Sequence, residues 1–268
     1  MFMLEYGVEQ VPKSLSVLGR ADYTIRTPIF GALVETDDGL ILLDTGISGP
    51  ALADHDALTE IYGADMHPTG PAGNPVEVAL ASIGFTVSDV SLAVVSHLHI
   101  DHTGGIPLLA AAGVPITIMA DELDYGLERA AQGTERSVGF YRPDYLDPAI
   151  DWRTIDGDEE LAPGVHAVTT PGHTPGHMSF RVDLPETGTW IFAADAADLG
   201  ENLLERIPCG STAEADDAPK ALASINRLMD DGDRLDARVI PGHDAVMPRE
   251  SRLASAGRSP MISIPRLC

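Results

Sequence analysis

Three histidines and one aspartate stand within six positions of the segment SHLHIDHTGG, directly after an apolar run. Side chains two positions apart in an extended chain point the same way, so His97 and His99 can bind one metal ion together. Asp101 and His102 follow where two glycines help the chain to turn, and from there they can face a second ion. Imidazole and carboxylate groups are ligands that zinc and its first-row neighbours accept. The segment therefore predicts a metal site, since burying these groups at an ordinary strand end would be costly.

Three later segments supply the further ligands that two ions would need, about seven in all. His173 lies in TTPGHTPGH, where glycines and prolines can present an imidazole from a loop, while Asp195 ends WIFAAD and His243 ends RVIPGHD. Each of these residues alone would be an ordinary loop residue, but together with the first segment they favour a metal centre. We predict His97, His99 and His173 as ligands of the first ion, Asp101, His102 and His243 as ligands of the second, and Asp195 as the bridge between them.

Strand-like and helix-like segments alternate along the chain and would position these side chains. The turn DDG between two apolar runs predicts a hairpin over 29–46, and a glycine closes a predicted helix over 75–84. Segment 135–152 is aromatic and broken by proline, so we expect a long loop or a lid there. Strands interleaved with helices predict an α/β architecture whose site lies on loops at one sheet edge. The other expected elements are strands at 90–97, 115–120, 164–173, 177–184, 189–198 and 237–244, and helices at 104–113, 121–133 and 213–232.

The composition indicates a globular protein with an unusually acidic surface. The chain has 268 residues, 44% of them hydrophobic, and its 41 acidic and 17 basic residues give a net charge of -24. Such a charge repels phosphate groups, so we expect neither nucleic acid nor an anionic membrane as a partner. The N-terminus has no basic region before an apolar core, and the longest apolar run, 105–120, is broken by proline and glycine. We therefore predict a cytoplasmic protein without signal peptide or membrane span. The two cysteines, Cys209 and Cys268, form no pair with metal-ligand spacing.

The motifs SHLHIDHTGG, TPGHTPGH, FAAD and PGHD together resemble those of the metallo-β-lactamase superfamily, and ILLDTG at 41–46 resembles its early strand–turn element. The resemblance covers residues from about 30 to 245 and implies a four-layer αββα sandwich with a dinuclear metal site at one edge. Nothing in the sequence marks a linker between domains, so we predict a single domain over 1–268. Segment 135–152 would be a lid-like insertion, and 250–268 a C-terminal tail that docks on the body or on a second subunit. The contexts FAADAADLGENL and TPGHTPGHMSF look most like those of the N-acyl-homoserine lactone hydrolases and related small-lactone hydrolases.

A pair of ions would make this a hydrolytic site. Two cations flanking one water lower its pKa toward neutrality and hold a hydroxide, while one ion polarises the substrate carbonyl. The chain contains no G-x-S-x-G nucleophile elbow. We therefore expect a metal-dependent hydrolase that opens a lactone or a similar small ester, in which the resemblance assigns proton transfer to the leaving alkoxide to Asp101. Zinc is the expected metal, although iron, manganese and cobalt accept the same ligands.

One position departs from the resembled lactonases. They usually carry a tyrosine three residues after the bridging aspartate, where its hydroxyl can reach the substrate carbonyl, and this chain has Asp198 there. An ionised carboxylate would repel a developing oxyanion. Either Asp198 points elsewhere, or it is protonated, or the substrate is not a standard acyl-homoserine lactone. Tyr125, Tyr141 and Tyr145 are alternative donors.

Further residues are expected to support the site. Asp44 is expected to orient a ligand imidazole through a hydrogen bond, the alternative being a capped turn. His177 either forms a hydrogen bond near the site or simply begins a strand. Phe140, Tyr141 and Tyr145 form either an apolar wall for the substrate or ordinary packing.

Several other functions fit parts of the sequence. A thioesterase of the glyoxalase II kind would need basic residues for anionic glutathione, which the arginines of the tail allow but the negative chain disfavours. A mononuclear iron dioxygenase on the same fold would differ in metal content and in oxygen consumption. Charge disfavours a nuclease, the lack of an export signal disfavours a β-lactamase, and the complete ligand set disfavours a non-catalytic binding protein. The sequence leaves open whether the protein is a monomer or a homodimer.

Overall fold

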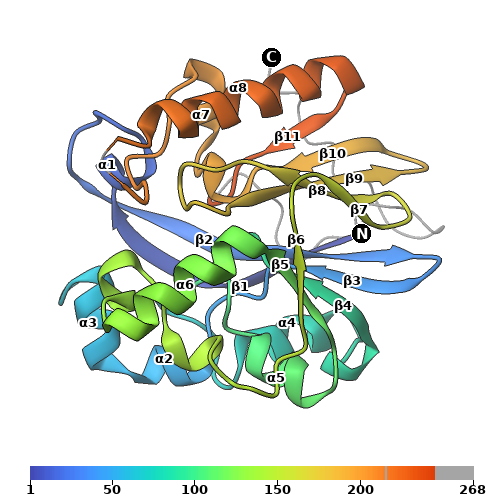
Figure 1. The fold of residues 1–268 in the computed structure, drawn as a ribbon, viewed down its shortest axis with the longest axis horizontal. Helices are drawn as coiled ribbons and strands as arrows, with labels where there is room; N and C mark the ends of the chain where they lie inside the picture. Colours follow the sequence, from blue (N-terminus) through green and yellow to red (C-terminus); the bar gives the residue numbers. More distant parts are fainter. Residues whose placement is uncertain (215, 245–268) are drawn as a thin grey trace.

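The computed structural model describes residues 1–214 and 216–244 and arranges them in four layers (Figure 1). A six-stranded sheet and a five-stranded sheet face each other, and helices cover the outer face of each. The predicted αββα sandwich is confirmed. The predicted tail at 250–268 lies outside the described residues.

The first sheet is built from the N-terminal half of the chain. Its spatial order follows the sequence, with antiparallel pairs at its beginning and parallel pairs from the third strand onward. Parallel neighbours need crossover segments, which the helices between them supply. The strands are β1 (Phe2–Pro12), β2 (Thr24–Thr36), β3 (Gly39–Leu43), β4 (Val90–Val94), β5 (Ile116–Met119) and β6 (Trp152–Ile155). The helices and 3-10 turns of this half are α1 (Lys13–Ser16), α2 (Gly49–Ala53), α3 (His55–Tyr62), α4 (Pro75–Ser82), η1 (Val87–Asp89), α5 (Ile106–Ala111), α6 (Ala120–Gln132), η2 (Glu135–Val138) and η3 (Arg142–Asp144).

The second sheet follows in the C-terminal half and is antiparallel except at its last pair. Its strands lie in the spatial order 11-10-9-8-7. The two helices that follow its fourth strand along the chain form the helical layer above this sheet in Figure 1. The strands are β7 (Glu159–Ala162), β8 (Val165–Thr169), β9 (Met178–Leu184), β10 (Gly188–Phe192) and β11 (Arg238–Ile240). The helices are α7 (Gly200–Glu205) and α8 (Ala218–Leu235), with the 3-10 turn η4 (Ala194–Ala196) directly after β10.

Strand β1 shows how the core is divided between the layers. Phe2, Leu4 and Tyr6 pack with the helices on one face, and Met1 and Met3 pack between the two sheets on the other. A strand that is apolar on both faces has no polar and apolar alternation. For that reason sequence patterning did not identify β1, although it forms ten of the cross-strand pairs with β2.

Most predicted elements are confirmed, and the differences lie at their ends. The hairpin turns between Thr36 and Gly39, whose φ of 122° suits glycine. Helix α8 begins at Ala218 rather than at 213 because Pro219 occupies its first turn, where a missing N–H costs nothing. Helices α2, α3 and α7 and strands β6 and β7 were not predicted.

Segment 135–152 packs tightly against the body of the first half. Phe140 and Tyr145 are fully buried, and the backbone N–H of Ile100 donates a hydrogen bond to Gly139 O at 3.0 Å. Asp144 is buried as well and accepts a hydrogen bond from Thr103 Oγ1 at 3.2 Å. The segment therefore forms a wall along the loop that carries the first histidines.

Over residues 1–214 and 216–244, we find no helix with the length and apolar character needed to cross a bilayer.

The buried carboxyl group of Asp144 makes stability depend on pH. Burial raises its pKa from 3.8 to about 7, against the hydrogen bonds of Ser48 and Thr103. The folded protein then keeps a proton that the unfolded chain has released, so stability is lost as the pH rises from about 4 to about 7. We expect Asp144→Asn to remove this loss. Between pH 4 and pH 8, the free energy of unfolding of the variant should rise relative to that of wild type by at most about 4 kcal/mol. Urea unfolding across this pH range measures it, and parallel stability curves for the two proteins would contradict it.

Candidate metal centre

The loops after β4, β8, β10 and β11 bring together the seven side chains that the sequence singled out. One group consists of His97, His99, His173 and Asp195, and the other of Asp101, His102 and His243; within each group, ligand atoms lie within 4.8 Å of one another. Six of the seven are buried, and His99 is partly exposed. Because β4 belongs to one sheet and the other three strands to the second, the site lies where the two sheets meet.

Asp195 stands between the two groups. Its Oδ2 lies 3.3 Å from His173 Nε2 and 3.7 Å from His97 Nε2, and its Oδ1 lies 3.0 Å from His243 Nε2 and 3.2 Å from His102 Nε2. Each carboxylate oxygen thus faces a different group. Asp195 does not end a strand, as the sequence suggested, because β10 stops at Phe192 and η4 turns the chain toward the site.

The spacing of the imidazole nitrogens suits a shared cation. His99 Nδ1 lies 2.9 Å from His97 Nε2 and 2.9 Å from His173 Nε2. Each imidazole nitrogen is either a donor or an acceptor, so three converging nitrogens cannot all be hydrogen-bonded to one another. Ligand atoms arranged tetrahedrally at zinc distances are about 3.3 Å apart. In the second group, the buried Nε2 atom of His102 has no hydrogen-bond partner. The residues present therefore fit metal ions at both positions.

Hydrogen bonds behind the imidazoles hold their orientation in the β4 loop. His102 Nδ1 donates to Asp44 Oδ2 at 2.9 Å, and Asp44 also accepts from the backbone N–H and the hydroxyl of Ser96, at 2.7 and 2.9 Å. His97 Nδ1 in turn lies 2.9 Å from Ser96 Oγ. With each Nδ1 bound on the outside, the Nε2 atoms of His97 and His102 are left facing the centre.

Backbone carbonyls orient the histidines of the second half in the same manner. His173 Nδ1 donates to Ser211 O at 3.1 Å, and His243 Nδ1 donates to Pro28 O at 3.0 Å. His177 does not face either group; its Nδ1 contacts Thr170, and its Nε2 accepts from the backbone N–H of Asp195 at 3.1 Å. It thereby holds the turn that presents the central carboxylate.

Two glycines allow the ligand loops to approach neighbouring backbone. A Cβ on Gly104 would lie 2.1 Å from the backbone atoms of Ile47 and Ser48, and one on Gly242 would lie 2.5 Å from Ala194 O. Any side chain at these positions would therefore push apart the loops that carry His102, Asp195 and His243.

The electrostatics differ between the groups. Burial lowers the pKa of His97 well below its ordinary value, that of His99 to about 3, and that of His173 as well. These imidazoles are therefore neutral at physiological pH, the form that binds metal. Burial also disfavours a charge on His102, but neighbouring carboxylates, Asp101 foremost, more than offset this and raise its pKa well above the ordinary value.

Asp198, at the position where the sequence departs from the resembled lactonases, is buried beside Cys209. The thiol of Cys209 donates to Asp198 Oδ1 at 3.1 Å. Burial and then the charge of Asp195 raise the pKa of Asp198 to about 8. The carboxyl group is thus turned toward the thiol and holds a proton near neutral pH, which favours the first two of the three explanations for this residue.

None of the three tyrosines considered as donors forms a hydrogen bond with a ligand side chain in the described structure. Tyr145 donates to Gly126 O at 3.3 Å and Tyr141 donates to Asp54 Oδ2 at 3.2 Å. The hydroxyl of Tyr125 is buried without a hydrogen-bond partner. The ring of Phe140 contacts the first ligand group, with its centroid 5.4 Å from that of His99.

Two residues near the centre escaped the sequence analysis because they lie on elements that it did not identify. Glu9, on β1, is buried and lies 3.5 Å from His243 Nδ1. Tyr62 is the last residue of α3. Burial raises its pKa well above the ordinary value, and so do the charges of neighbouring carboxylates and a side-chain hydrogen bond with Glu9. These carboxylates are Asp101, Glu9 and Asp195. The phenol of Tyr62 is therefore a protonated donor within electrostatic reach of both groups.

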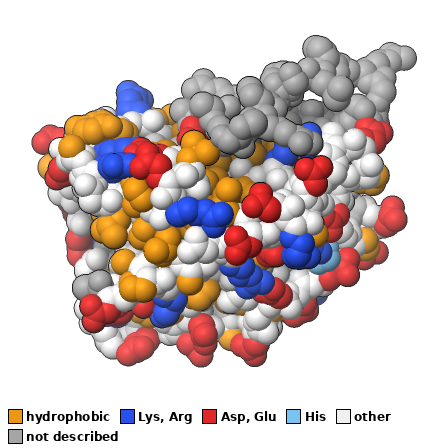
Figure 2. Space-filling view, turned by 90° about the horizontal axis from the view of Figure 1, so that it is seen from above, with side chains coloured by type: hydrophobic (Ala, Val, Ile, Leu, Met, Phe, Trp, Pro, Cys, Tyr) orange, Lys and Arg blue, Asp and Glu red, His pale blue; other side chains and the backbone are white. Residues whose placement is uncertain are grey.

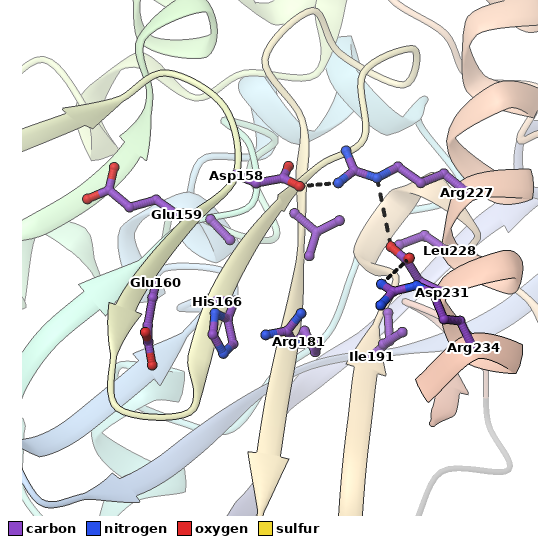
Figure 3. Close-up of a pocket in the computed structure, with 12 residues that line it drawn as sticks. Asp158, Glu159, Glu160, His166, Arg181, Ile191, Arg227, Leu228, Asp231 and Arg234 are labelled. Carbon is purple, nitrogen blue, oxygen red and sulfur yellow. Dashed lines mark hydrogen bonds and ion pairs between the residues drawn. The ribbon is translucent and has the colours of Figure 1, made fainter. Parts of the chain in front are cut away.

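A surface groove of about 270 Å³ lies away from the metal centre, between the β7–β8 hairpin and α8 (Figure 3). Arg227 pairs with Asp158 and lies 3.9 Å from Asp231, which also pairs with Arg234 at 2.6 Å. Acidic and basic side chains also stand side by side on the face seen in Figure 2. The arginines of the groove are thus already paired, and it contains none of the residues singled out in the sequence.

The sequence of this chain is similar to those of known proteins. The family profile described as the metallo-beta-lactamase superfamily matches residues 26–243. An N-acyl homoserine lactonase of Bacillus cereus is 30% identical over 225 residues, which make up 82% of this chain and 82% of that protein.

Solved structures are similar over almost the whole chain. One is an N-acyl homoserine lactone hydrolase with the product N-hexanoyl-L-homoserine bound at its catalytic metal center, with a TM-score of 0.79, 26% identity, and coverage of 91% of this chain and 92% of that one. Another, a quorum-quenching N-acyl homoserine lactone hydrolase, has a TM-score of 0.75, 26% identity and coverage of 91% of both chains. With the fold, the converging histidines and a profile match over most of its length, this chain belongs to the metallo-β-lactamase superfamily.

Proposed function

We propose that this protein is a metal-dependent hydrolase that opens the lactone ring of N-acyl homoserine lactones and so quenches quorum-sensing signals. The observation that carries the proposal is the carboxylate of Asp195, which lies between two buried groups of ligand side chains. The similar lactonases, which align with more than four-fifths of the chain, support the substrate class.

We propose two divalent ions as cofactors, with zinc as the metal. Three imidazole nitrogens and one carboxylate oxygen in the first group suit tetrahedral zinc, although iron, manganese and cobalt accept similar ligands. When bound, the ions polarise the ester carbonyl and lower the pKa of a water. The proposed ligands are His97, His99 and His173 at one position, Asp101, His102 and His243 at the other, and Asp195 at both.

Asp101 is proposed to accept the proton of the attacking water and to pass it on. It is buried, and its Oδ2 lies 3.4 Å from His102 Nε2 and 3.6 Å from His243 Nε2. Burial disfavours its charge, but these two histidines hold its pKa down at about 2, so it is ionised and can accept a proton. Passing that proton to the alkoxide that leaves the opened ring completes the hydrolysis.

Tyr62 is proposed to donate a hydrogen bond to the substrate in place of the tyrosine that Asp198 replaces. Burial and the charges of Asp101 and Glu9 raise the pKa of its hydroxyl, which therefore keeps its proton. To stabilise an oxyanion, the hydroxyl would exchange its hydrogen bond with Glu9 for one to the substrate. Asp198 does not oppose this role, because its carboxyl group is turned toward Cys209.

A cytoplasmic location, a single domain and a monomeric or homodimeric state stay predictions of the sequence.

Removing His102 should remove one ion. We expect His102→Ala to bind about one metal ion fewer per chain than wild type and to lose at least about 100-fold in kcat/KM. Elemental analysis of the purified protein and lactone hydrolysis measure the two effects, with the exposed His55→Ala as the control. Unchanged metal content in His102→Ala would contradict the ligand assignment.

The preference for substrate separates lactonase from thioesterase and dioxygenase. We expect kcat/KM for N-acyl homoserine lactones to exceed that for glutathione thioesters by at least about 100-fold, without oxygen uptake, because the acidic chain disfavours an anionic thioester. A panel of acylated, aliphatic and aromatic lactones, glutathione thioesters and an oxygen electrode measures this. Turnover of simple lactones without any acyl-homoserine lactone turnover would mean that the substrate is a different lactone.

Tyr62→Phe should lower kcat with little change in KM. Loss of one donor to an oxyanion costs about 100-fold in kcat, and the phenyl ring retains the packing of the side chain. Steady-state kinetics and elemental analysis measure this, because metal content should stay as in wild type. Tyr23→Phe, at an exposed position, is the matched control. A kcat for Tyr62→Phe equal to that of the control would refute the assigned role.

A further inference from the structure

A buried carboxylate outside the two ligand groups joins the loops that carry the first of them. Glu122, in the first turn of α6, is fully buried. Its Oε1 accepts a hydrogen bond from the backbone N–H of Leu98 at 2.9 Å, and its Oε2 accepts one from Gly176 at 3.1 Å. Each oxygen of one side chain therefore holds a different loop.

The two donors sit beside ligands. Leu98 lies between His97 and His99 in the sequence, and Gly176 lies three residues after His173 in the other loop. The backbone of Met178 also donates to Ser96 O at 3.0 Å, so the loops are in direct contact. All three imidazoles of the first group thus depend on backbone that Glu122 or this contact holds in place.

The approach of the second loop to α6 is close. A Cβ on Gly176 would lie 2.2 Å from the backbone nitrogen of Glu122, so only glycine lets the loop reach the carboxylate. Burying a carboxylate is costly unless it is hydrogen-bonded, and here two backbone N–H groups provide the bonds. Such an arrangement is specific to one relative placement of the two loops.

We propose that Glu122 is a positioning residue for the metal ion held by His97, His99 and His173, because it sets the distance between the loops that carry them. The inference rests on the proposed metal centre. The second position depends on Glu122 less directly. Asp101 and His102 share the β4 loop with Leu98, but neither lies on the Gly176 loop, and His243 comes from a third loop and is bound by Pro28 O.

Glu9 offers an internal comparison at that second position. It accepts a hydrogen bond from Thr27 Oγ1 at 3.0 Å and lies 3.5 Å from His243 Nδ1. A change at Glu9 should therefore act on the ion near His243, and a change at Glu122 on the ion near His173.

The test measures metal binding directly. Apo-protein is reloaded with Zn²⁺ in competition with a chromophoric chelator, and the Co²⁺ form is followed by its visible absorption spectrum. In Glu122→Gln the amide keeps the size of the side chain but turns an NH₂ group toward one backbone N–H, so one hydrogen bond is lost. We expect one of the two ions to bind at least about tenfold more weakly, with an altered Co²⁺ spectrum.

The His102→Ala background shows which ion is affected, because it leaves the first position to be measured alone. There, Glu122→Gln should weaken the remaining ion at least about tenfold and Glu9→Gln should not. Glu128→Gln, on the exposed face of the same helix, is the matched control and should bind metal as its parent does. Should Glu122→Gln fail to fold, Glu122→Asp, whose oxygens are held one methylene farther from the loops, carries the same expectation.

The outcomes separate this inference from the proposed function. Wild-type affinity for both ions in Glu122→Gln, or an equal weakening of both, would overturn the positioning role, and so would a fall in apo-protein stability with unchanged affinities. Wild-type protein that takes up no ions would overturn the metal centre itself and the inference with it.

Discussion

The placement of one carboxylate between four imidazole nitrogens is the constraint on which the rest of the structure depends. Asp195 is almost completely buried, and each of its oxygens faces a different group of ligand side chains. Burying so many ionisable groups is unfavourable unless each has a partner of opposite charge, a hydrogen bond or a cation. The sandwich meets that condition by bringing strand ends of both sheets to one place, so neither sheet alone forms the site.

Hydrogen bonds to surrounding groups hold the ligand imidazoles in their orientation. Asp44 and Ser96 hold the imidazoles of the β4 loop, while backbone carbonyls hold those of the second half. These bonds determine which ring nitrogen faces the centre, and a preset orientation reduces the entropy that metal binding must otherwise overcome. The same principle extends to Glu122, which holds backbone rather than a ring.

The carboxyl groups at the surface and at the metal centre differ in their partners and in their protonation. On the surface, the excess of carboxylates over basic groups keeps the chain strongly negative, and the arginines of the α8 groove are already paired. At the centre, Asp101 and Asp195 face neutral or readily protonated imidazoles. Asp198 shows a third case, because burial beside Cys209 raises the pKa of its carboxyl group to about 8.

The sequence by itself predicted an α/β architecture, because strand-like and helix-like segments alternate, and the resemblance of its motifs implied the four-layer sandwich. It also identified the clustered side chains, because the histidine and aspartate motifs follow apolar runs. It also predicted the hairpin at Gly39 and helix α4, whose signals are turn and cap residues. Only the tertiary structure decided the roles of Glu9, Tyr62 and Glu122. Glu9 and Glu122 contact the ligand loops across 24 or more positions of sequence, and Tyr62 lies within electrostatic reach of Asp101 and Asp195. Their importance comes from contacts between distant elements and from burial, and neither leaves a periodic or local pattern in the chain.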